Sequence, residues 1–242
     1  MPATPSFYLA PESWTAPYIL SGKEARHLSR VLRLGRGASV RLFDGRGRQG
    51  IFRVDSADRG KVVLRPERME SLAPPAVRCT LAAGFSKALR RGWFLEKAVE
   101  LEASALWFWQ GEYSQASLPE QEKETWTAAL IAGAKQCENP WLPELSMLRG
   151  GVDALVRRLP DMDRAFLLYE GDTGGRLLSP QDLAGPGDLL LIVGPEGGFS
   201  PGEVQRLTAG GALAVSLGPR VLRWETAAVL TLGLAWWARQ RP

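Results

Sequence analysis

Hydrophobic positions in the last two thirds of the chain alternate between short continuous runs and runs with helical spacing. The continuous runs predict buried strands, and the helically spaced runs predict helices between them. The predicted strands are residues 77–83, 106–109, 165–169, 188–193 and 212–217, and the predicted helices are residues 93–103, 119–136 and 152–159. This alternation is typical of an α/β domain built on a mostly parallel sheet.

The first third of the chain has a different pattern. Apolar and polar residues alternate in three short segments, 39–43, 49–54 and 61–64, and the sequences between them are rich in glycine and aspartate. A period of two with such turns predicts a small antiparallel β-meander closed into a compact barrel. We therefore predict two domains, a β-barrel over residues 1–72 and an α/β domain over residues 73–242.

Positive charge is concentrated in the predicted barrel. Residues 1–72 contain 13 Lys and Arg against 7 Asp and Glu, whereas residues 73–242 contain 17 against 19, and the whole chain has a net charge of +4. Counterion release from a phosphate backbone favours binding of such a basic surface. The charge predicts a nucleic-acid partner, and a solvated basic surface that aids solubility is the alternative.

Within residues 22–33, three arginines recur with the spacing of one helical face: Arg26, Arg30 and Arg33. The apolar residues of the same segment fall elsewhere on the helical wheel: Leu28, Val31 and Leu32. The segment predicts a helix with one cationic face and one buried face. We expect the three arginines to bind RNA or DNA, and an ordinary solvated helix face is the alternative.

The sequence contains no pattern typical of a metal site or of a membrane-spanning segment. Cys79 and Cys137 are isolated, and the only histidine, His27, has no clustered partners that would complete a metal site. We expect His27 to be a packed or surface residue, and a catalytic residue is the alternative. The longest apolar run, residues 227–238, is shorter than the ~20 residues that cross a bilayer, and residues 1–14 lack the pattern of a signal peptide. We predict a cytoplasmic protein with no metal and no membrane contact.

Two glycine-containing loops after predicted strands mark the candidate binding site. Residues 194–200 read Gly-Pro-Glu-Gly-Gly-Phe-Ser, and residues 218–226 read Gly-Pro-Arg-Val-Leu-Arg-Trp-Glu-Thr. Ligands of parallel sheets bind where the carboxyl ends of strands meet such loops. Ser200, Pro201 and Glu203 fit the N-cap, N1 and N3 positions of a capping box, so a helix should begin directly after the first loop.

Glycines let the backbone approach a nucleotide-like ligand closely, although a tight turn that uses glycine for positive φ is the structural alternative. The chain contains neither a Walker loop nor a Gly-x-Gly-x-x-Gly segment after an early strand. A methyl donor, an adenosine and a flavin all remain candidate ligands at this point.

The last apolar stretch predicts a helix with little polar surface. One stripe contains Ala228, Leu232, Ala235 and Trp236, and a second contains Leu230, Leu234 and Trp237. The sheet can cover one stripe, and a second subunit is the simplest cover for the other, which predicts a homodimer. A wholly internal helix is the alternative.

The two loops together resemble the paired signature of the SPOUT methyltransferases, and more narrowly that of the 16S ribosomal RNA (uracil-N3)-methyltransferase family, RsmE. The C-terminal motifs are Gly-Pro-Glu-Gly-Gly-Phe-Ser at 194–200 and Leu-Gly-Pro-Arg-Val-Leu-Arg-Trp-Glu-Thr-Ala at 217–227. Residues 27–33, 42–47 and 97–101 are similar to other blocks of the same family. The resemblance spans nearly the whole chain.

The resemblance implies an α/β fold in which a SPOUT-type C-terminal domain contains a trefoil knot on a mostly parallel sheet, plus a small N-terminal PUA-like β-barrel. It implies S-adenosylmethionine as cofactor and a homodimer with its site near the subunit interface. By motif position it implies these cofactor-binding residues: Leu168, Glu170, Val193, Gly194, Glu196, Gly197, Gly198, Leu217, Gly218, Val221, Leu222 and Thr226.

The implied reaction is methylation at N3 of a uridine in small-subunit ribosomal RNA. Arg223 is our candidate cation for the charge left on the uracil oxygens when N3 loses its proton, and a loop-bracing ion pair with Glu196 or Glu225 is the alternative. Glu225 is the candidate proton acceptor. A catalytically silent RNA-binding or ribosome-assembly factor, and a methyltransferase of another RNA base, are the alternative functions.

The chain departs from the family pattern at three places. Glu102 stands where a glycine is frequent, residues 135–139 read Lys-Gln-Cys-Glu-Asn where the family has Glu-Gln-x-Gly-Arg, and residues 111–114 lack an expected Arg-Ser pair. We expect these segments to face the RNA, so the departures concern the substrate rather than the cofactor.

Overall fold

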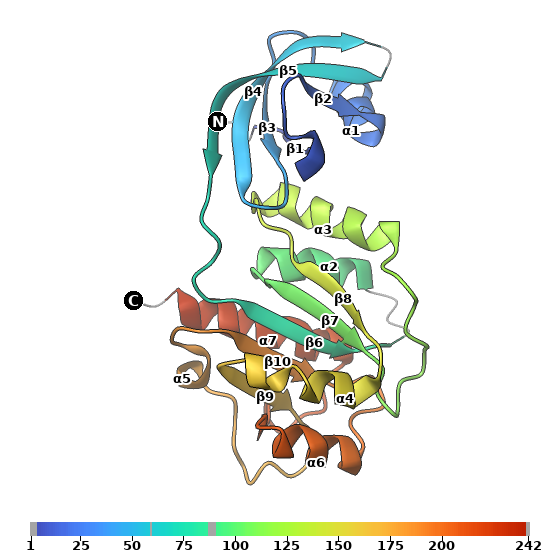
Figure 1. Cartoon of the computed structure of the whole chain (residues 1–242), viewed down its shortest axis with the longest axis vertical. Helices are drawn as coiled ribbons and strands as arrows, with labels where there is room; N and C mark the ends of the chain where they lie inside the picture. The colour runs from blue at the N-terminus through green and yellow to red at the C-terminus, as the bar shows by residue number, and fades with distance from the viewer. Residues whose placement is uncertain (1–3, 59, 87–90, 241–242) are drawn as a thin grey trace. The chain divides into compact units, whose positions relative to one another are not determined.

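The computed structural model describes residues 4–58, 60–86 and 91–240 of the chain, which forms two compact units (Figure 1). The N-terminal unit comprises Met1–Pro74 together with Ile131–Leu142, and the C-terminal unit comprises Pro75–Leu130 together with Pro143–Pro242. The segment Ile131–Leu142 is separated in sequence from the rest of the N-terminal unit. A single domain boundary placed along the sequence therefore does not predict that this segment belongs to the N-terminal unit.

The N-terminal unit is built on a curled five-stranded sheet in the order β1-β3-β4-β5-β2. Its strands are β1 (Ser6–Tyr8), β2 (Tyr18–Ser21), β3 (Ser39–Phe43), β4 (Arg48–Asp58) and β5 (Lys61–Ser71), with a 3-10 turn at Pro11–Ser13. The predicted antiparallel meander is confirmed by β3, β4 and β5. Strands β1 and β2 were not predicted, because three or four residues are too few for a clear alternation.

The predicted helix over residues 22–33 is irregular. Helix α1 (Gly22–Arg26) continues into a π-helical turn, His27–Val31, in which the Leu32 N–H donates to the His27 carbonyl at 3.0 Å. Arg33 follows the helical segment with a φ of 53°. The three arginines Arg26, Arg30 and Arg33 are exposed, as predicted.

The apolar side of this segment differs from the prediction. Leu28 is fully buried, whereas Val31 is 67% and Leu32 is 39% exposed. A π-helical turn bonds residue i to i+5, so residues after it are shifted from the positions that a regular α-helical wheel gives them. The prediction that Val31 and Leu32 lie on the buried face is therefore wrong.

The C-terminal unit contains a six-stranded sheet in the order β11-β9-β10-β6-β7-β8, and all its neighbouring strands are parallel. Its strands are β6 (Cys79–Gly84), β7 (Ala105–Trp109), β8 (Glu144–Leu148), β9 (Arg164–Leu168), β10 (Leu189–Val193) and β11 (Leu213–Val215). Five of them correspond to predicted strands. Strand β8 lies at the edge and is only partly buried, so it lacks the continuous apolar run that marks the others.

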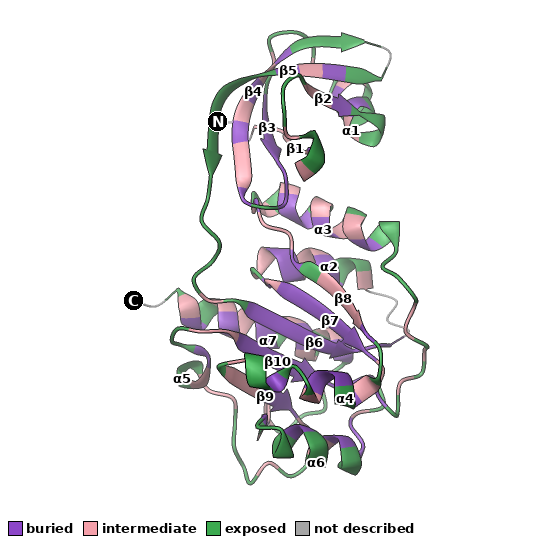
Figure 2. Ribbon diagram, viewed as in Figure 1, coloured by how far each residue is buried: buried purple, intermediate pink, exposed green. Residues whose placement is uncertain are grey.

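Helices cover both faces of this sheet (Figure 1). Helix α7 (Trp224–Arg239) packs on β6 and β10 and contacts α2 (Arg91–Glu100) and α5 (Pro180–Leu183). On the other face, α4 (Gly151–Val156) packs on β7, and α6 (Pro201–Ala209) packs on β9. The chain also forms α3 (Glu124–Cys137) and a 3-10 turn at Leu159–Asp161. With both faces covered, β6, β7 and β10 are buried along their whole length (Figure 2).

The predicted two stripes of α7 have different environments. Ala228, Leu232 and Ala235 are fully buried in the C-terminal unit, whereas Leu230 is 40% and Trp237 is 53% exposed. The second stripe therefore has apolar surface that the described residues leave uncovered. No helix among the described residues is long and apolar enough to span a membrane.

Candidate functional site

Neighbouring strands of the parallel sheet end at the same level. Val193, the last residue of β10, pairs with Leu168 of β9 and Ala83 of β6, and Leu168 also pairs with Val215 of β11. Because the strands are parallel, the loops that follow them meet at one edge of the sheet. The two glycine-containing loops of the sequence follow β10 and β11, so both lie at this edge.

The loop after β10 leads directly into α6. Gly198 has a φ of 75°, and its N–H donates to the Pro195 carbonyl at 2.9 Å. The predicted capping box is confirmed: the Ser200 hydroxyl accepts from the Glu203 N–H at 3.3 Å, and the Glu203 carboxylate accepts from the Ser200 N–H at 2.9 Å. Glu203 is buried and also accepts from the Glu112 N–H at 2.8 Å, which anchors the loop after β7 to α6.

The loop after β11 is shaped by a serine and a glycine. Gly218 has a φ of 122°, and its N–H donates to the Ser216 hydroxyl at 3.1 Å. A side chain at such a φ is strained, so this turn requires glycine. The loop ends at Arg223, which is the N-cap residue of α7.

The segment after β9 completes the site. The Tyr169 N–H donates to the Val215 carbonyl at 2.9 Å, and the Glu170 carboxylate lies against Gly198 of the β10 loop. A Cβ atom on Gly198 would overlap a Glu170 carboxylate oxygen, so glycine allows the close approach of these two segments. Three loops that are remote in sequence thus enclose one space.

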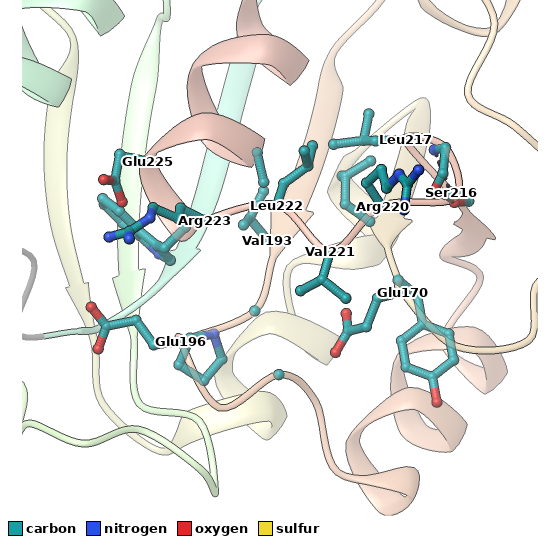
Figure 3. A pocket seen from close by; sticks show the side chains of 18 residues that line it. Glu170, Val193, Glu196, Ser216, Leu217, Arg220, Val221, Leu222, Arg223 and Glu225 are labelled. Carbon is teal, nitrogen blue, oxygen red and sulfur yellow. Dashed lines mark hydrogen bonds between the residues drawn. The ribbon is translucent and has the colours of Figure 1, made fainter.

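That space is a cavity of about 390 Å³ (Figure 3). Glu196, Arg223 and Glu225 gather at one end of the view, Glu170 and Arg220 lie toward the other, and Val221 lies between them. Of the residues implied by the resemblance, the cavity is lined by Leu168, Glu170, Val193, Gly194, Glu196, Gly198, Leu217, Gly218, Val221 and Leu222. Both candidate catalytic residues, Arg223 and Glu225, line it as well.

Two residues of the implied set do not line the cavity. Gly197 lies in the same loop but packs against Tyr113 of the β7 loop, and Thr226 is exposed in the first turn of α7. The cavity also contains residues to which the sequence assigned no role: Tyr169, Pro195, Ser216, Arg220, Trp224 and Ala227. Four of them lie within the two loop motifs, and Tyr169 and Ser216 adjoin predicted residues.

Most charged side chains that line the cavity have no ion-pair partner among the described residues. Within the part of the chain that the structure describes, the Arg223 side chain has no hydrogen-bond or ion-pair partner, so the alternative of a loop-bracing ion pair with Glu196 or Glu225 is not formed. The buried indole N–H of Trp224 also has no hydrogen-bond partner among the described residues. Val221 lines the cavity and is 86% exposed, so its apolar side chain is accessible to a ligand there.

These residues fit S-adenosylmethionine. The cavity volume lies within the range of about 300–1,000 Å³ that is usual for small-molecule sites. Its apolar side chains, such as Leu217 and Leu222, suit an adenine ring, and the carboxylates of Glu170 and Glu196 suit the positive charges of the cofactor. Among the described residues, no group of three His, Cys, Asp or Glu side chains is arranged to hold a metal ion.

Two departures from the family pattern fall where the backbone itself favours glycine. Glu102 and Glu138 have φ values of 57° and 58°, in the left-handed region, and each stands where the family pattern has glycine. Lys135 is not an unpaired cation, because its ammonium group lies 2.5 Å from a carboxylate oxygen of Glu24. The glutamates at 102 and 138 therefore strain the backbone where glycine would not, and the lysine at 135 is paired with a carboxylate of the same chain.

Comparison with known proteins identifies the class of each unit. Residues 73–236 match the RNA methyltransferase domain family, and residues 20–67 match the RNA methyltransferase PUA domain family. The ribosomal RNA small subunit methyltransferase E of Mycobacterium tuberculosis is 32% identical over 224 residues, which are 89% of this chain and 84% of the relative. The Bacillus subtilis protein of the same name is 27% identical over 225 residues, 89% of this chain and 88% of that one.

Two solved structures share the fold over 98% of both chains. One is a probable rRNA-methyltransferase from Porphyromonas gingivalis, 30% identical with a TM-score of 0.86. The other is a Legionella pneumophila protein assigned as a methyltransferase in complex with the bound cofactor SAM, 26% identical with a TM-score of 0.84. The fold and site thus define an RNA methyltransferase domain joined to a PUA domain. Within that class, the chain belongs to the ribosomal RNA small subunit methyltransferase E family.

Proposed function

We propose that the protein transfers the methyl group of S-adenosylmethionine to N3 of a uridine in 16S ribosomal RNA. The observation that carries the proposal is the convergence of the loops after β9, β10 and β11 on one cavity, in a chain of this family. A structural relative that contains SAM supports the choice of cofactor. The N3 position comes from the family resemblance, and the action on small-subunit RNA from the names of the relatives.

The chain's own residues would divide the work of holding the cofactor. Leu168, Val193, Leu217 and Leu222 offer apolar surface, while Gly194 and Gly198 leave room for the neighbouring side chains of Phe199 and Glu170. When bound, S-adenosylmethionine supplies an electrophilic methyl group. Fixing the attacking nitrogen in line with that group is worth about 7–11 kcal/mol of the barrier in well-oriented reactions.

Arg223 and Glu225 are the residues we assign to the uracil. The N3 imide is mostly protonated at neutral pH, so the reaction leaves negative charge on the uracil oxygens when the proton departs. The Arg223 guanidinium, which has no partner among the described residues, would stabilise that charge. The Glu225 carboxylate beside it would accept the proton from N3. Because N3 lies on the pairing edge, the uridine must be unpaired or splayed out of a helix.

The relatives favour this function over its alternatives. They are named as methyltransferases of small-subunit ribosomal RNA, which supports an active enzyme over a silent RNA-binding or assembly factor. The direct experiment incubates the protein and labelled S-adenosylmethionine with small subunits that lack the modification, followed by mapping of reverse-transcription stops. We expect incorporated label and one new stop at a uridine. Label without a stop at uridine would indicate another base, and no label would contradict an active enzyme.

The N-terminal unit is proposed to orient the RNA through its arginines. Reversing the charge of Arg26, Arg30 and Arg33 to glutamate should weaken binding of small-subunit RNA by tenfold or more at low salt. The slope of log affinity against log salt should flatten by about 2–3, because each lost phosphate contact removes about 0.7–0.9. The measurement is a salt titration of RNA binding, alongside calorimetry of S-adenosylmethionine binding, which should be unchanged.

A matched control reverses three exposed arginines of the C-terminal unit: Arg149, Arg157 and Arg206. It carries the same change in net charge, so an equal loss of affinity in both triple variants would indicate a general charge effect. Unchanged affinity and salt slope in the N-terminal variant would contradict the assigned role.

We propose that the protein acts as a homodimer in the cytoplasm, where small subunits are assembled. The exposed apolar side chains of Leu230 and Trp237 on α7 support a second copy as the cover for this stripe. Replacing both with lysine should shift the sedimentation velocity at micromolar concentration from that of two chains to that of one. Met69→Lys changes an exposed apolar residue of β5 in the same way and should leave the dimer intact. A wild-type protein that sediments as one chain would contradict the proposal.

A further inference from the structure

An arginine outside the assigned site is held in a fixed position close to the cofactor loop. Arg91 begins α2, and its guanidinium lies over two aromatic rings, 4.4 Å from the centroid of Phe85 and 5.0 Å from that of Trp126. One of its terminal nitrogens also donates a hydrogen bond to the Ser86 carbonyl. The planar group is therefore oriented as well as positioned.

The charge on Arg91 is incompletely balanced. Among the described residues, no carboxylate lies within ion-pair distance of its guanidinium. The side chain is partly buried, and this burial lowers the pKa of Arg91, while the carboxylate of Glu196 opposes the shift. An arginine stays protonated in proteins. The site thus retains a desolvated cation that has aromatic faces and a carbonyl as its close partners.

The topology brings Arg91 to the reactive edge of the sheet. Phe85 follows β6, which pairs in parallel with β10, and Gly84 at the end of β6 touches the backbone of Pro195 in the cofactor loop. Glu196 is the next residue of that loop and lines the cavity. Tyr113, from the loop after β7, packs on Gly197 and is 45% exposed. The Arg91 guanidinium thus lies within electrostatic range of Glu196, and the backbone of the partly exposed Tyr113 packs on the next residue of the cofactor loop, Gly197.

A purely structural role does not explain the choice of arginine. An apolar side chain would cover Phe85 and Trp126 without the cost of desolvating a charge. A guanidinium held flat presents its N–H groups in a fork that matches two oxygens of a phosphate. Phe85 and Trp126 are themselves buried, so their rings hold the guanidinium and are not surfaces on which bases stack.

We infer that Arg91 binds a backbone phosphate of the RNA strand that presents the target uridine to the cavity. The inference rests on the proposed function and adds an RNA contact on the methyltransferase unit, separate from the arginines of the N-terminal unit. Arg91 is a substrate-positioning residue in this account, because it contacts the strand and not the reacting atoms.

The test compares Arg91→Gln with Arg91→Lys and the wild type. Binding of a single-stranded RNA that contains the mapped uridine is measured at several salt concentrations, together with kcat, KM for RNA, affinity for S-adenosylmethionine and thermal stability. We expect Arg91→Gln to weaken RNA binding by about tenfold and to flatten the salt slope by about 0.7, the value for one phosphate contact on a single strand. KM for RNA should rise while cofactor affinity stays within twofold. Arg91→Lys should keep most of the salt slope.

Arg206→Gln is the matched control, because it removes one charge from an exposed arginine of the same unit and should leave the salt slope unchanged. An unchanged slope in Arg91→Gln, with lower thermal stability and weaker cofactor binding, would assign Arg91 to bracing the aromatic side chains and overturn the inference. Failure of the proposed function is distinguishable, because it would appear in the wild type as absence of RNA methylation.

Discussion

Replacing Arg223 with alanine is expected to lower kcat by about 10²- to 10³-fold, the range observed when one preorganised donor to a developing anion is removed. The reason is that Arg223 lines the cavity and no described carboxylate neutralises it, so its charge is available to the uracil oxygens. S-adenosylmethionine affinity should fall far less than kcat, because the cofactor is positively charged. Single-turnover methylation of small subunits and calorimetry of cofactor binding measure the two effects separately.

Arg220→Ala is the matched control for Arg223→Ala. Arg220 also lines the cavity, but it lies toward the other end in Figure 3 from Arg223 and Glu225. Its loss should reduce turnover much less. Equal turnover in Arg223→Ala and the wild type would remove Arg223 from the mechanism.

Replacing Gly84 with alanine is expected to impair both folding stability and cofactor binding. The new Cβ atom would overlap the backbone nitrogen of Pro195 and lie 2.6 Å from the carbonyl carbon of Gly194, so the cofactor loop must shift. Overpacking of this kind costs about 1–3 kcal/mol of unfolding free energy. For a chain of this size each kcal/mol lowers Tm by roughly 2–4 °C. Thermal unfolding and calorimetry with S-adenosylmethionine measure the two consequences.

Gly92 provides the control for Gly84. It lies in α2, and a Cβ atom there would meet nothing within 4 Å. Gly92→Ala should stabilise the protein by about 0.5–1 kcal/mol, because alanine is the better helix former. Wild-type cofactor affinity in Gly84→Ala would mean that the position of the Gly194–Pro195 backbone does not matter for binding.

The sequence predicted the C-terminal sheet because its signals there were local and strong. Strands such as β10 are continuous apolar runs, and the capping box at Ser200 and Glu203 marks the start of α6 in both the sequence and the structure. The two glycine loops could be assigned to one edge of the sheet, since parallel strands place their carboxyl ends together.

Other features of the fold and the site depend on three-dimensional contacts, which the pattern of hydrophobic and polar residues along the sequence does not show. The π-helical turn after Arg26 exposes Val31 and Leu32, although a regular wheel buries them. The membership of Ile131–Leu142 in the N-terminal unit rests on side-chain contacts such as the ion pair of Lys135 with Glu24. Arg91 carried no motif, and only the folded chain sets it over Phe85 and Trp126. The trefoil knot, which concerns how the loops thread, stays a prediction.

A crystal structure of the protein with S-adenosylmethionine tests the central claim most directly. We predict that the cofactor contacts Gly194–Gly198 and Leu217–Leu222 simultaneously, with its methyl group directed toward the end of the cavity that contains Arg223 and Glu225. Cofactor bound elsewhere, or in contact with only one of these two loops, would contradict the account.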